Sequence, residues 1–423
     1  MADSVSETRS DRRLQRFPAL HFLQAFRIAI QFPQLLFASI AVLALALGQR
    51  VIDDAPFAPP DAESPLPWDT PAIDATGRPL DSIGGSAAGF ADLLLMPFRS
   101  VMQPAAGLLS PGNAWTDAAY HWTHLLWALL VWAFFGAAIT RVAAIKFAVD
   151  QTISVKSAAR FGLKRFGAYL FAPLIPTAGL LFLWLLCTVG GWIARIPAAG
   201  PYIAALLWFV VLALGLVMAL IVIGIAAGWP LMSPAIAAED SESFDGFSRA
   251  FSYVYGRPLL GIRLIVCGLG CGVAIVGGVV LLAPLAADLG VWGVATGMGL
   301  PDAAELTADS TFFQFSLTDK TATSPPPETA RGIATFWLNA AAVIVHGFAA
   351  SLFWTLSTIA YFVLRQADDG TALDEVFLWD EEQPDALLPL VGVAASEQPV
   401  IERPLTKDAG TTPGASVEPE EPS

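Results

Sequence analysis

The sequence predicts an all-α membrane protein: a polytopic bundle of six transmembrane helices, with amphipathic cytoplasmic elbow helices that form a parallel internal repeat. Three observations carry this prediction. The 423-residue chain is 55% hydrophobic and only 14% charged, whereas soluble domains carry about 25% charged residues. Six apolar runs, with their flanks, reach the roughly 20 residues that a bilayer core requires. An acidic, amphipathic stretch recurs between consecutive runs.

The overall charge limits the classes of partner. The net charge of −14 excludes nucleic-acid binding, which needs a basic face for the phosphates. All three cysteines, Cys187, Cys267 and Cys271, fall inside apolar runs. They therefore form no secreted disulfide framework, and we expect no cofactor.

Residues 1–31 are predicted to form a cytoplasmic N-terminus with an amphipathic interfacial helix from residue 14. Its Phe22 and Phe26 would enter the acyl boundary while Arg16 and Arg27 reach the headgroups. The six-helix membrane domain follows over residues 32–366. Its first span runs from Pro33 to about residue 48, and it is short for a bilayer.

Two acidic outer loops are predicted, over residues 49–118 and 288–331. Inside the first loop, the stretch from Phe90 to Leu109 is apolar, but Pro97 and Pro104 interrupt it. This pattern predicts a surface helix or a segment that dips into the membrane. Residues 367–423 form an acidic tail rich in Pro, Glu, Ser and Thr, which predicts a largely disordered cytoplasmic segment.

The remaining five spans are bounded by aromatic belts, prolines and short turns. Prolines 173 and 176 predict a kink near the start of the third span. The glycine pairs Gly224/Gly228 and Gly268/Gly272 have the four-residue spacing that lets helix backbones approach closely in lipid. The predicted spans are His121–Ile145, Ala168–Ile193, Tyr202 to about Ala227, Leu259 to about Ala286, and Ala334 to about Leu364.

The distribution of Lys and Arg predicts the orientation. Basic residues gather beside the span ends on the side that holds both termini, and the opposite side carries few of them over many more residues. The positive-inside rule therefore places both termini in the cytoplasm and the chain in the cell inner membrane.

The repeat is visible when Ala148 is superimposed on Ala237. Asp150 then falls on Glu239 and Arg160 falls on Arg249. Each copy reads as a span, an acidic residue, an amphipathic elbow and a second span. Residues 367–369 suggest a third, partial copy whose elbow is supplied by residues 14–31. Because the copies run in the same direction, their axis would lie along the membrane normal.

The sharper copy carries a recognisable motif. Residues 234–240 read Pro-x-x-x-Ala-Glu-Asp, and residues 241–253 read Ser-x-Ser-Phe-x-x-x-x-Arg-Ala-Phe-Ser-Tyr. This elbow resembles a poorly characterised group of six-helix bacterial membrane proteins, distantly similar to the YciC-like and glycerophosphodiester phosphodiesterase membrane-domain families. The resemblance covers about residues 120–365. It implies a fold and no catalysis, because no soluble phosphodiesterase domain is attached.

The elbow holds the strongest candidates for an interaction site. Acids at the start of a helix stabilise its free N–H groups, which favours a structural role. Ser241 or Ser243 would then cap the helix, and Arg249 would bridge to Glu239 or Asp245. A lipid-headgroup or partner-protein site is the alternative. The candidate residues are Glu239, Asp240, Glu242, Asp245, Arg249, Arg257 and Arg263.

Four further polar residues are weaker candidates. His121 and His124 share a helix face and would bind a metal only with a carboxylate such as Asp117; interfacial histidines among aromatic residues are the simpler interpretation. His346 and Asn339 are the main polar groups of the sixth span. An ionisable group inside a membrane is a functional candidate, although a lone histidine more often hydrogen-bonds a neighbouring helix.

These patterns predict an integral membrane protein with a structural, scaffold or partner- and lipid-binding role. No predicted span has an acidic residue near its middle, and no Walker A, GxSxG, HExxH or CxxC pattern occurs. We therefore expect no enzyme, with membrane lipids and membrane or cytoplasmic proteins as partners. A transporter or channel subunit is the alternative, and a membrane enzyme acting on lipid phosphates is less favoured. The oligomeric state stays open.

Overall fold

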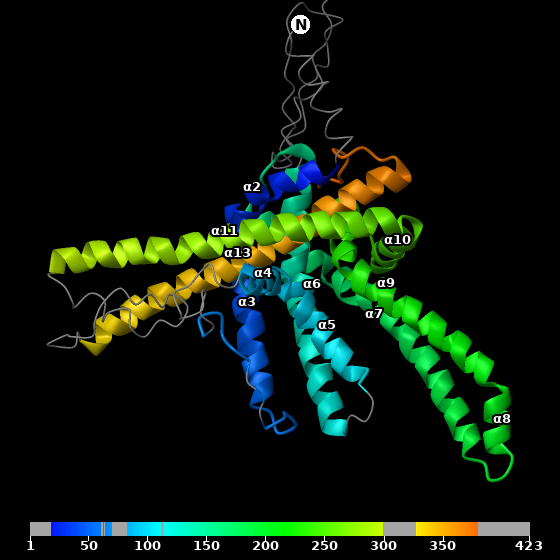
Figure 1. Cartoon of the computed structure of the whole chain (residues 1–423). Helices are drawn as coiled ribbons and strands as arrows, with labels where there is room; N and C mark the ends of the chain where they lie inside the picture. The colour runs from blue at the N-terminus through cyan, green and yellow to red at the C-terminus, as the bar shows by residue number, and fades with distance from the viewer. Residues whose placement is uncertain are drawn as a thin grey trace, which may run out of the picture. The chain divides into compact units, whose positions relative to one another are not determined.

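The computed structural model describes residues 18–60, 62, 64–69, 83–110, 114–298 and 327–379. All regular structure in these ranges is helical (Figure 1). All of it lies in one compact unit, Met1–Phe377. The elements in chain order are a 3₁₀ helix η1 (Pro18–Gln24) and the α-helices α2 (Ala25–Ala29), α3 (Phe32–Asp53), α4 (Ile83–Leu94), α5 (Met96–Leu108), α6 (Trp115–Val149), α7 (Val155–Ala194), α8 (Gly200–Leu206), α9 (Trp208–Glu239), α10 (Ser243–Gly256), α11 (Pro258–Met298) and α13 (Glu328–Asp369).

Six of these helices are long and apolar enough to cross a membrane: α3, α6, α7, α9, α11 and α13. Each contains most of one span expected from the apolar runs, but the predicted fourth span starts at Tyr202, which lies in the separate helix α8. The all-α class is thereby confirmed, with six helices that could span a membrane. At about 1.5 Å per residue, α7, α11 and α13 each extend roughly 60 Å, twice the thickness of a bilayer core.

Several predicted boundaries are wrong because the helices continue beyond their apolar cores. The amphipathic stretch after residue 154 is no separate elbow; it runs without a break into the third span as α7. No proline lies at that junction, whereas Pro258 separates α10 from α11. The predicted loop 288–331 begins and ends in helix, since α11 continues to Met298 and α13 starts at Glu328. Its centre lies outside the described residues.

The predicted outer loop 49–118 is also partly helical. The helices α4 and α5 meet at Leu95, and Pro97 occupies the first turn of α5, where its missing N–H group leaves no bond unmade. Leu94 is 2% exposed and lies where a side chain on Gly272 of α11 would clash with it. Ser100 contacts Trp132 of α6. The α4–α5 junction is therefore buried among the long helices.

The centre of the bundle is formed by α6 and α13. Trp354 of α13 is fully buried and packs against Trp132 of α6 and Trp229 of α9, with ring centroids 5.7 and 5.2 Å apart. Such aromatic pairs add about 0.5–1.5 kcal/mol each beyond their buried area. We call the end of the bundle where α6, α9 and α13 finish the elbow end, and the end where α3 finishes and α6 begins the loop end.

The N-terminal segment packs on protein to a greater extent than the sequence suggested. Within η1 and α2, Phe22 and Ile28 are each 1% exposed, and Phe22 lies against Gly268 of α11. Leu23 and Phe26 remain exposed, as an interfacial helix requires. Residues 1–17, including Arg16, lie outside the described residues.

The glycines do not act as expected from their spacing. Gly272 accommodates the Leu94 side chain, and the glycine pair of α9 faces an aromatic ring of α10. Close backbone approach occurs elsewhere: a Cβ on Gly347 of α13 would lie 2.7 Å from the Cα atom of Ser39 in α3. Small residues at this crossing let α3 and α13 pack directly against each other.

Large apolar side chains cover the outer surfaces of the long helices. The α7 and α9 helices form a hairpin closed by α8 (Figure 1). Its exposed residues include Phe182, Trp192 and Phe209. Surfaces of this composition face hydrocarbon when a helix of this length lies in a bilayer.

Candidate functional site

The predicted elbow site is a network of charged side chains at the elbow end. The structure brings together Glu239, Asp240, Glu242, Arg249 and Arg257, five of the seven candidates. No ion pair links Asp245 or Arg263 to them in the described part of the chain. Four other charged residues complete the network. We call the elbow cluster the set Arg165, Glu239, Asp240, Glu242, Arg249, Arg257, Arg365, Asp368 and Asp369.

Glu239, the last residue of α9, joins three elements. Its Oε2 atom lies 2.9 Å from Arg249 Nε of α10, which confirms the bridge expected between these residues. Its Oε1 atom accepts a 2.8 Å hydrogen bond from the Tyr361 hydroxyl and lies 3.7 Å from Arg365 Nη1, both on α13. Tyr361 and Arg365 are almost completely buried, so Glu239 gives the Tyr361 hydroxyl its acceptor and the Arg365 guanidinium a nearby negative charge.

Asp240 ties α7 to the end of α9. Arg165 donates from Nε to the Asp240 carboxylate and from Nη2 to its backbone oxygen, each at 2.6 Å. Arg165 Nη1 lies 3.1 Å from Glu242, whose side chain is 77% exposed. Glu242 also stands at the N-cap of α10 but makes no capping hydrogen bond. The expected cap by Ser241 or Ser243 is therefore wrong.

The end of α13 completes the network. Asp368 lies 3.1 Å from Arg257 Nε, at the junction of α10 and α11. Asp369 accepts a hydrogen bond from the Tyr253 hydroxyl of α10. Burial raises the pKa of Tyr253, and the hydrogen bond to Asp369 raises it further. Tyr253 therefore stays neutral and remains a donor at physiological pH.

A buried arginine and the segment after α13 hold the backbone at the end of α9. Arg141, fully buried in α6, donates to the Ala237 carbonyl at 2.6 Å and stacks 4.8 Å over the Phe161 ring. The next carbonyl, Ala238, accepts from Phe377 N at 2.8 Å. These contacts satisfy carbonyls that the end of α9 would leave without partners. Residues 370–377, the start of the predicted acidic tail, thus fold back onto the elbow end.

The three helices that finish at the elbow end, α6, α9 and α13, end with the same backbone conformation. Asp150 after α6, Asp240 after α9 and Gly370 after α13 each adopt the left-handed conformation, with φ of 53°, 52° and 72°. Asp and Gly are the residues that enter this region at least cost. Arg27 of α2 lies 2.9 Å from Asp150. The Lys146 hydrogen bond, and then the Arg27 charge, lower the pKa of Asp150.

The ion pairs of the elbow cluster act as a clamp, because they hold the ends of several helices together. Its acids and bases lie on α7, α9, α10 and α13 and pair with one another. Pairs such as Arg165–Asp240 are shielded from solvent, and the network fixes the ends of four helices. A network of this kind contributes more to stability than separate surface ion pairs do.

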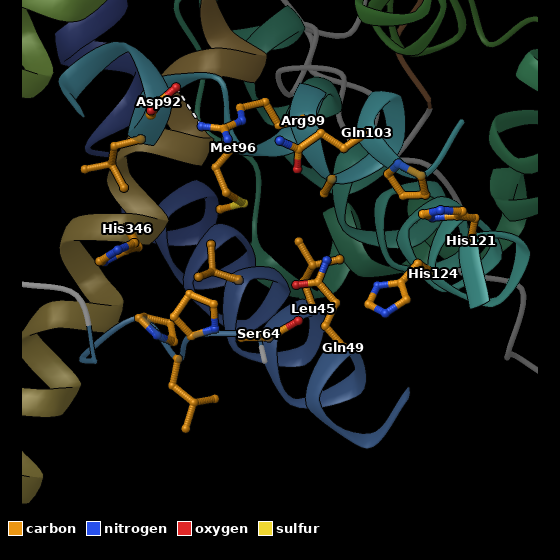
Figure 2. A pocket seen from close by; sticks show the side chains of 18 of the residues that line it. Leu45, Gln49, Ser64, Asp92, Met96, Arg99, Gln103, His121, His124 and His346 are labelled. Atoms are coloured by element: carbon orange, nitrogen blue, oxygen red, sulfur yellow. Dashed lines mark ion pairs between the residues drawn. The ribbon is translucent and has the colours of Figure 1, made fainter. Parts of the chain in front are cut away.

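A second site lies at the loop end and contains three of the four histidines, His121, His124 and His346. A cavity of about 530 Å³ opens between α3, α4, α5, α6 and α13, and residues 64–67 cover part of it. Figure 2 shows Arg99, Gln103 and Met96 on one side of the hollow, His121 and His124 on another, and His346 of α13 nearby. Three of the four weak candidates therefore line one cavity. Asn339 is half-buried on α13 and does not line it.

His124 and Tyr120 are fixed by a carboxylate behind the cavity wall. Asp53, the last residue of α3, accepts a 2.8 Å hydrogen bond from the Tyr120 hydroxyl and lies 3.2 Å from His124 Nε2. Its side chain is 5% exposed, and its Oδ2 atom has no hydrogen-bond partner. This carboxylate was not singled out in the sequence, where it ends an apolar run among several loop acids.

The opposite wall carries an ion pair. Asp92 of α4 lies 2.6 Å from Arg99 Nη1 of α5, and their side chains are 64% and 41% exposed. The Gln103 amide oxygen, in the orientation that suits both groups, accepts from Arg99 Nε and Nη2 at 3.2 and 2.9 Å. Val42, Leu45 and Ala46 of α3 form an apolar side. The cavity is therefore amphipathic.

The metal interpretation of the histidines gains no support from the geometry. Asp117 accepts from the Ala114 backbone N–H and caps its own helix, α6, instead of joining His121 and His124. Within the described ranges, no group of three or more His, Cys, Asp or Glu side chains is arranged to hold a metal ion.

The described residues form an α-helical bundle with six helices that could cross a membrane, a charged cluster at one end and an amphipathic cavity at the other. No protein-family model, no curated protein and no solved structure matches the chain.

Proposed function

We propose that this protein is an inner-membrane binding protein that holds a lipid or a similar amphiphile in the cavity at its loop end. One observation carries the proposal: about 530 Å³ of space, polar on one wall and apolar on another, lies among helices that could span a bilayer. Ligand pockets typically enclose about 300–1,000 Å³ and combine apolar walls with a few placed polar groups.

The proposed orientation puts the cavity on the outer side of the membrane. The elbow end carries many arginines and lysines, among them Arg165, Arg249, Arg257 and Arg365. The positive-inside rule favours the cytoplasm for such an end. With both termini there, the cavity faces the outer leaflet, and the α4–α5 pair enters the membrane from outside and returns.

We also propose that the elbows belong to a three-unit parallel repeat. The acid after each central helix pairs with an arginine from the elbow of another unit: Asp150 with Arg27, Asp240 with Arg165, and the acid at the end of α13 with Arg257. Asp150 and Asp240 both adopt the left-handed conformation and therefore occupy equivalent positions in the structure. The sequence alignment pairs Asp150 with Glu239 instead, so the two alignments differ by one residue. The proposed relation to six-helix bacterial membrane proteins rests on this elbow.

A binding role is favoured over catalysis by the kind of groups that face the cavity. They are one ion pair, amides and imidazoles, which recognise headgroups well. The elbow cluster is given a structural role, because its carboxylates already have partners within the protein.

Transport is the second candidate function, and the α4–α5 pair favours it. Helices that break inside the membrane commonly line substrate sites in transporters, and His346 lies near the middle of α13. Flux of a labelled amphiphile across liposomes tests this alternative. A rate that His346→Leu leaves unchanged would count against it.

Native mass spectrometry of the protein released gently from membranes tests the binding function. Gln49, which lines the cavity from α3, can be replaced by Trp to fill it. Leu47→Trp is the matched control, because Leu47 is 48% exposed and does not line the cavity. We expect a retained lipid on the wild type and on Leu47→Trp, and its loss on Gln49→Trp. Equal retention by all three proteins would refute the binding function.

A further inference from the structure

We propose that the cavity selects a zwitterionic headgroup, a phosphate joined to a primary ammonium, with the phosphate on Arg99 and the ammonium on Asp92. This inference rests on the proposed binding function and gives its ligand a chemical class. The two side chains lie on successive helices, α4 and α5, at the wall of the cavity (Figure 2).

The Arg99 guanidinium is already positioned for a phosphate. Its Nη1 atom contacts Asp92, and its Nε and Nη2 atoms donate to the Gln103 amide. A guanidinium has five N–H groups, so two remain after these three contacts. Phosphate oxygens match a guanidinium that offers two donors better than they match a single point charge.

The ion pair between Asp92 and Arg99 can be replaced by contacts of each side chain with a ligand, at little cost in free energy. Both side chains are substantially exposed, and ion pairs with this exposure contribute only about 0–1 kcal/mol. The Asp92–Arg99 contact uses one carboxylate oxygen, Oδ1. A primary ammonium beside Asp92 and a phosphate beside Arg99 would keep every charge matched.

The charges around the cavity favour a zwitterion over a simple ion. Asp92 and Arg99 are its fully charged lining residues. His121, His124 and His346 complete the ionisable lining together with Tyr120, and Asp53 lies behind His124. An anion alone would lie against the negative charge of Asp92, and a cation alone would lie against the positive charge of Arg99. A ligand with both charges places each of them beside the opposite charge of the protein.

The rest of the cavity fits a lipid. Val42, Leu45 and Ala46 provide an apolar wall for the glycerol region and the start of an acyl chain. The imidazoles across the cavity, including His121, can hydrogen-bond ester or phosphate oxygens. A soluble phosphoethanolamine compound presents the same headgroup without this apolar part.

The test compares phosphatidylethanolamine with phosphatidylglycerol, titrated onto delipidated full-length protein and followed by native mass spectrometry. We expect the wild type to prefer phosphatidylethanolamine. Asp92→Asn should lower this preference by about two- to fivefold, the effect of one partly exposed charge pair. Arg99→Gln should weaken both lipids. Asp54→Asn and Arg50→Gln make the same charge changes at the loop end outside the cavity lining, and they should keep the wild-type preference.

The outcomes separate this inference from the binding function. Equal binding of the two lipids by the wild type, or an unchanged preference in Asp92→Asn, overturns the zwitterion inference while leaving binding intact. Retention of both lipids by Gln49→Trp at the wild-type level would overturn the binding function and the zwitterion inference with it. Free phosphoethanolamine serves as the last probe: competition at concentrations similar to those of the lipid identifies a soluble ligand of the same chemistry, and weak competition identifies the lipid.

Discussion

Glu239 is the residue on which the elbow cluster depends most, and replacing it by alanine gives the sharpest test of the clamp. The change removes the acceptor of the Tyr361 hydroxyl at 2.8 Å and the carboxylate that faces Arg249 at 2.9 Å and Arg365 at 3.7 Å. Tyr361 is fully buried, and the Arg365 side chain is 4% exposed. The variant therefore leaves a buried donor and a buried cation short of a partner.

The expected loss follows from this burial. Removing one partner of a buried ion pair costs about 3–5 kcal/mol. Arg249 is 44% exposed and recovers solvent, and Arg365 keeps its hydrogen bonds to the Ala372 and Glu375 carbonyls. We therefore expect Glu239→Ala to lower the free energy of unfolding by about 3 kcal/mol, the lower end of that range.

Unfolding in mixed micelles with increasing dodecyl sulfate, followed by tryptophan fluorescence, measures this loss. Glu242→Ala is the matched control. It lies three residues away and pairs with Arg165, but it is 77% exposed, so about 0–1 kcal/mol is expected. Glu239→Gln keeps an oxygen for Tyr361 and should fall between the two. Equal losses for Glu239→Ala and Glu242→Ala would refute the reasoning.

Three further predictions concern other parts of the bundle. Gly347→Leu should disrupt the crossing of α3 and α13, because even a Cβ there meets the Ser39 backbone at 2.7–2.8 Å; Gly278→Leu, with open space around it, should retain the wild-type melting temperature. Asp53→Ala should cost about 1–3 kcal/mol, because it removes the hydrogen-bond partner of the half-buried Tyr120 and the buried His124. Asp53→Asn, measured by the same unfolding titration, should cost less. Burial lowers the pKa of His21. The contribution of His21 to stability is therefore complete above its unfolded pKa of about 6.5 and declines as the pH falls below that value. A stability difference between wild type and His21→Asn that stays the same at pH 7.5 and pH 5.5 would contradict this.

The six long helices could be predicted because a bilayer imposes a simple rule on the sequence. An apolar run of about 20 residues must become a helix whose backbone groups bond within the segment. The helix ends were less predictable. The helix α11 continues to Met298 because no proline lies between Ala286 and that residue. The elbow joins the third span because a helix tolerates the single glycine at the junction, Gly167.

The candidate sites were predicted to different extents. The bridge between Arg249 and Glu239 follows from their place on one elbow. The partners Arg165 and Arg365 come from α7 and α13, and no local pattern pairs them with α9. The cavity could not be predicted from the sequence for the same reason. His124 and His346 are more than 200 residues apart in the chain, and only the packing of the helices brings them to one cavity.

The central claim, a lipid held in the cavity at the loop end, is tested most directly by an experimental density map of the protein in phosphatidylethanolamine nanodiscs. The account predicts headgroup density beside Arg99 and Asp92, with an acyl chain leaving along Leu45 of α3. A map with this cavity free of lipid density, and with ordered lipid only on the outer faces of the long helices, would contradict it.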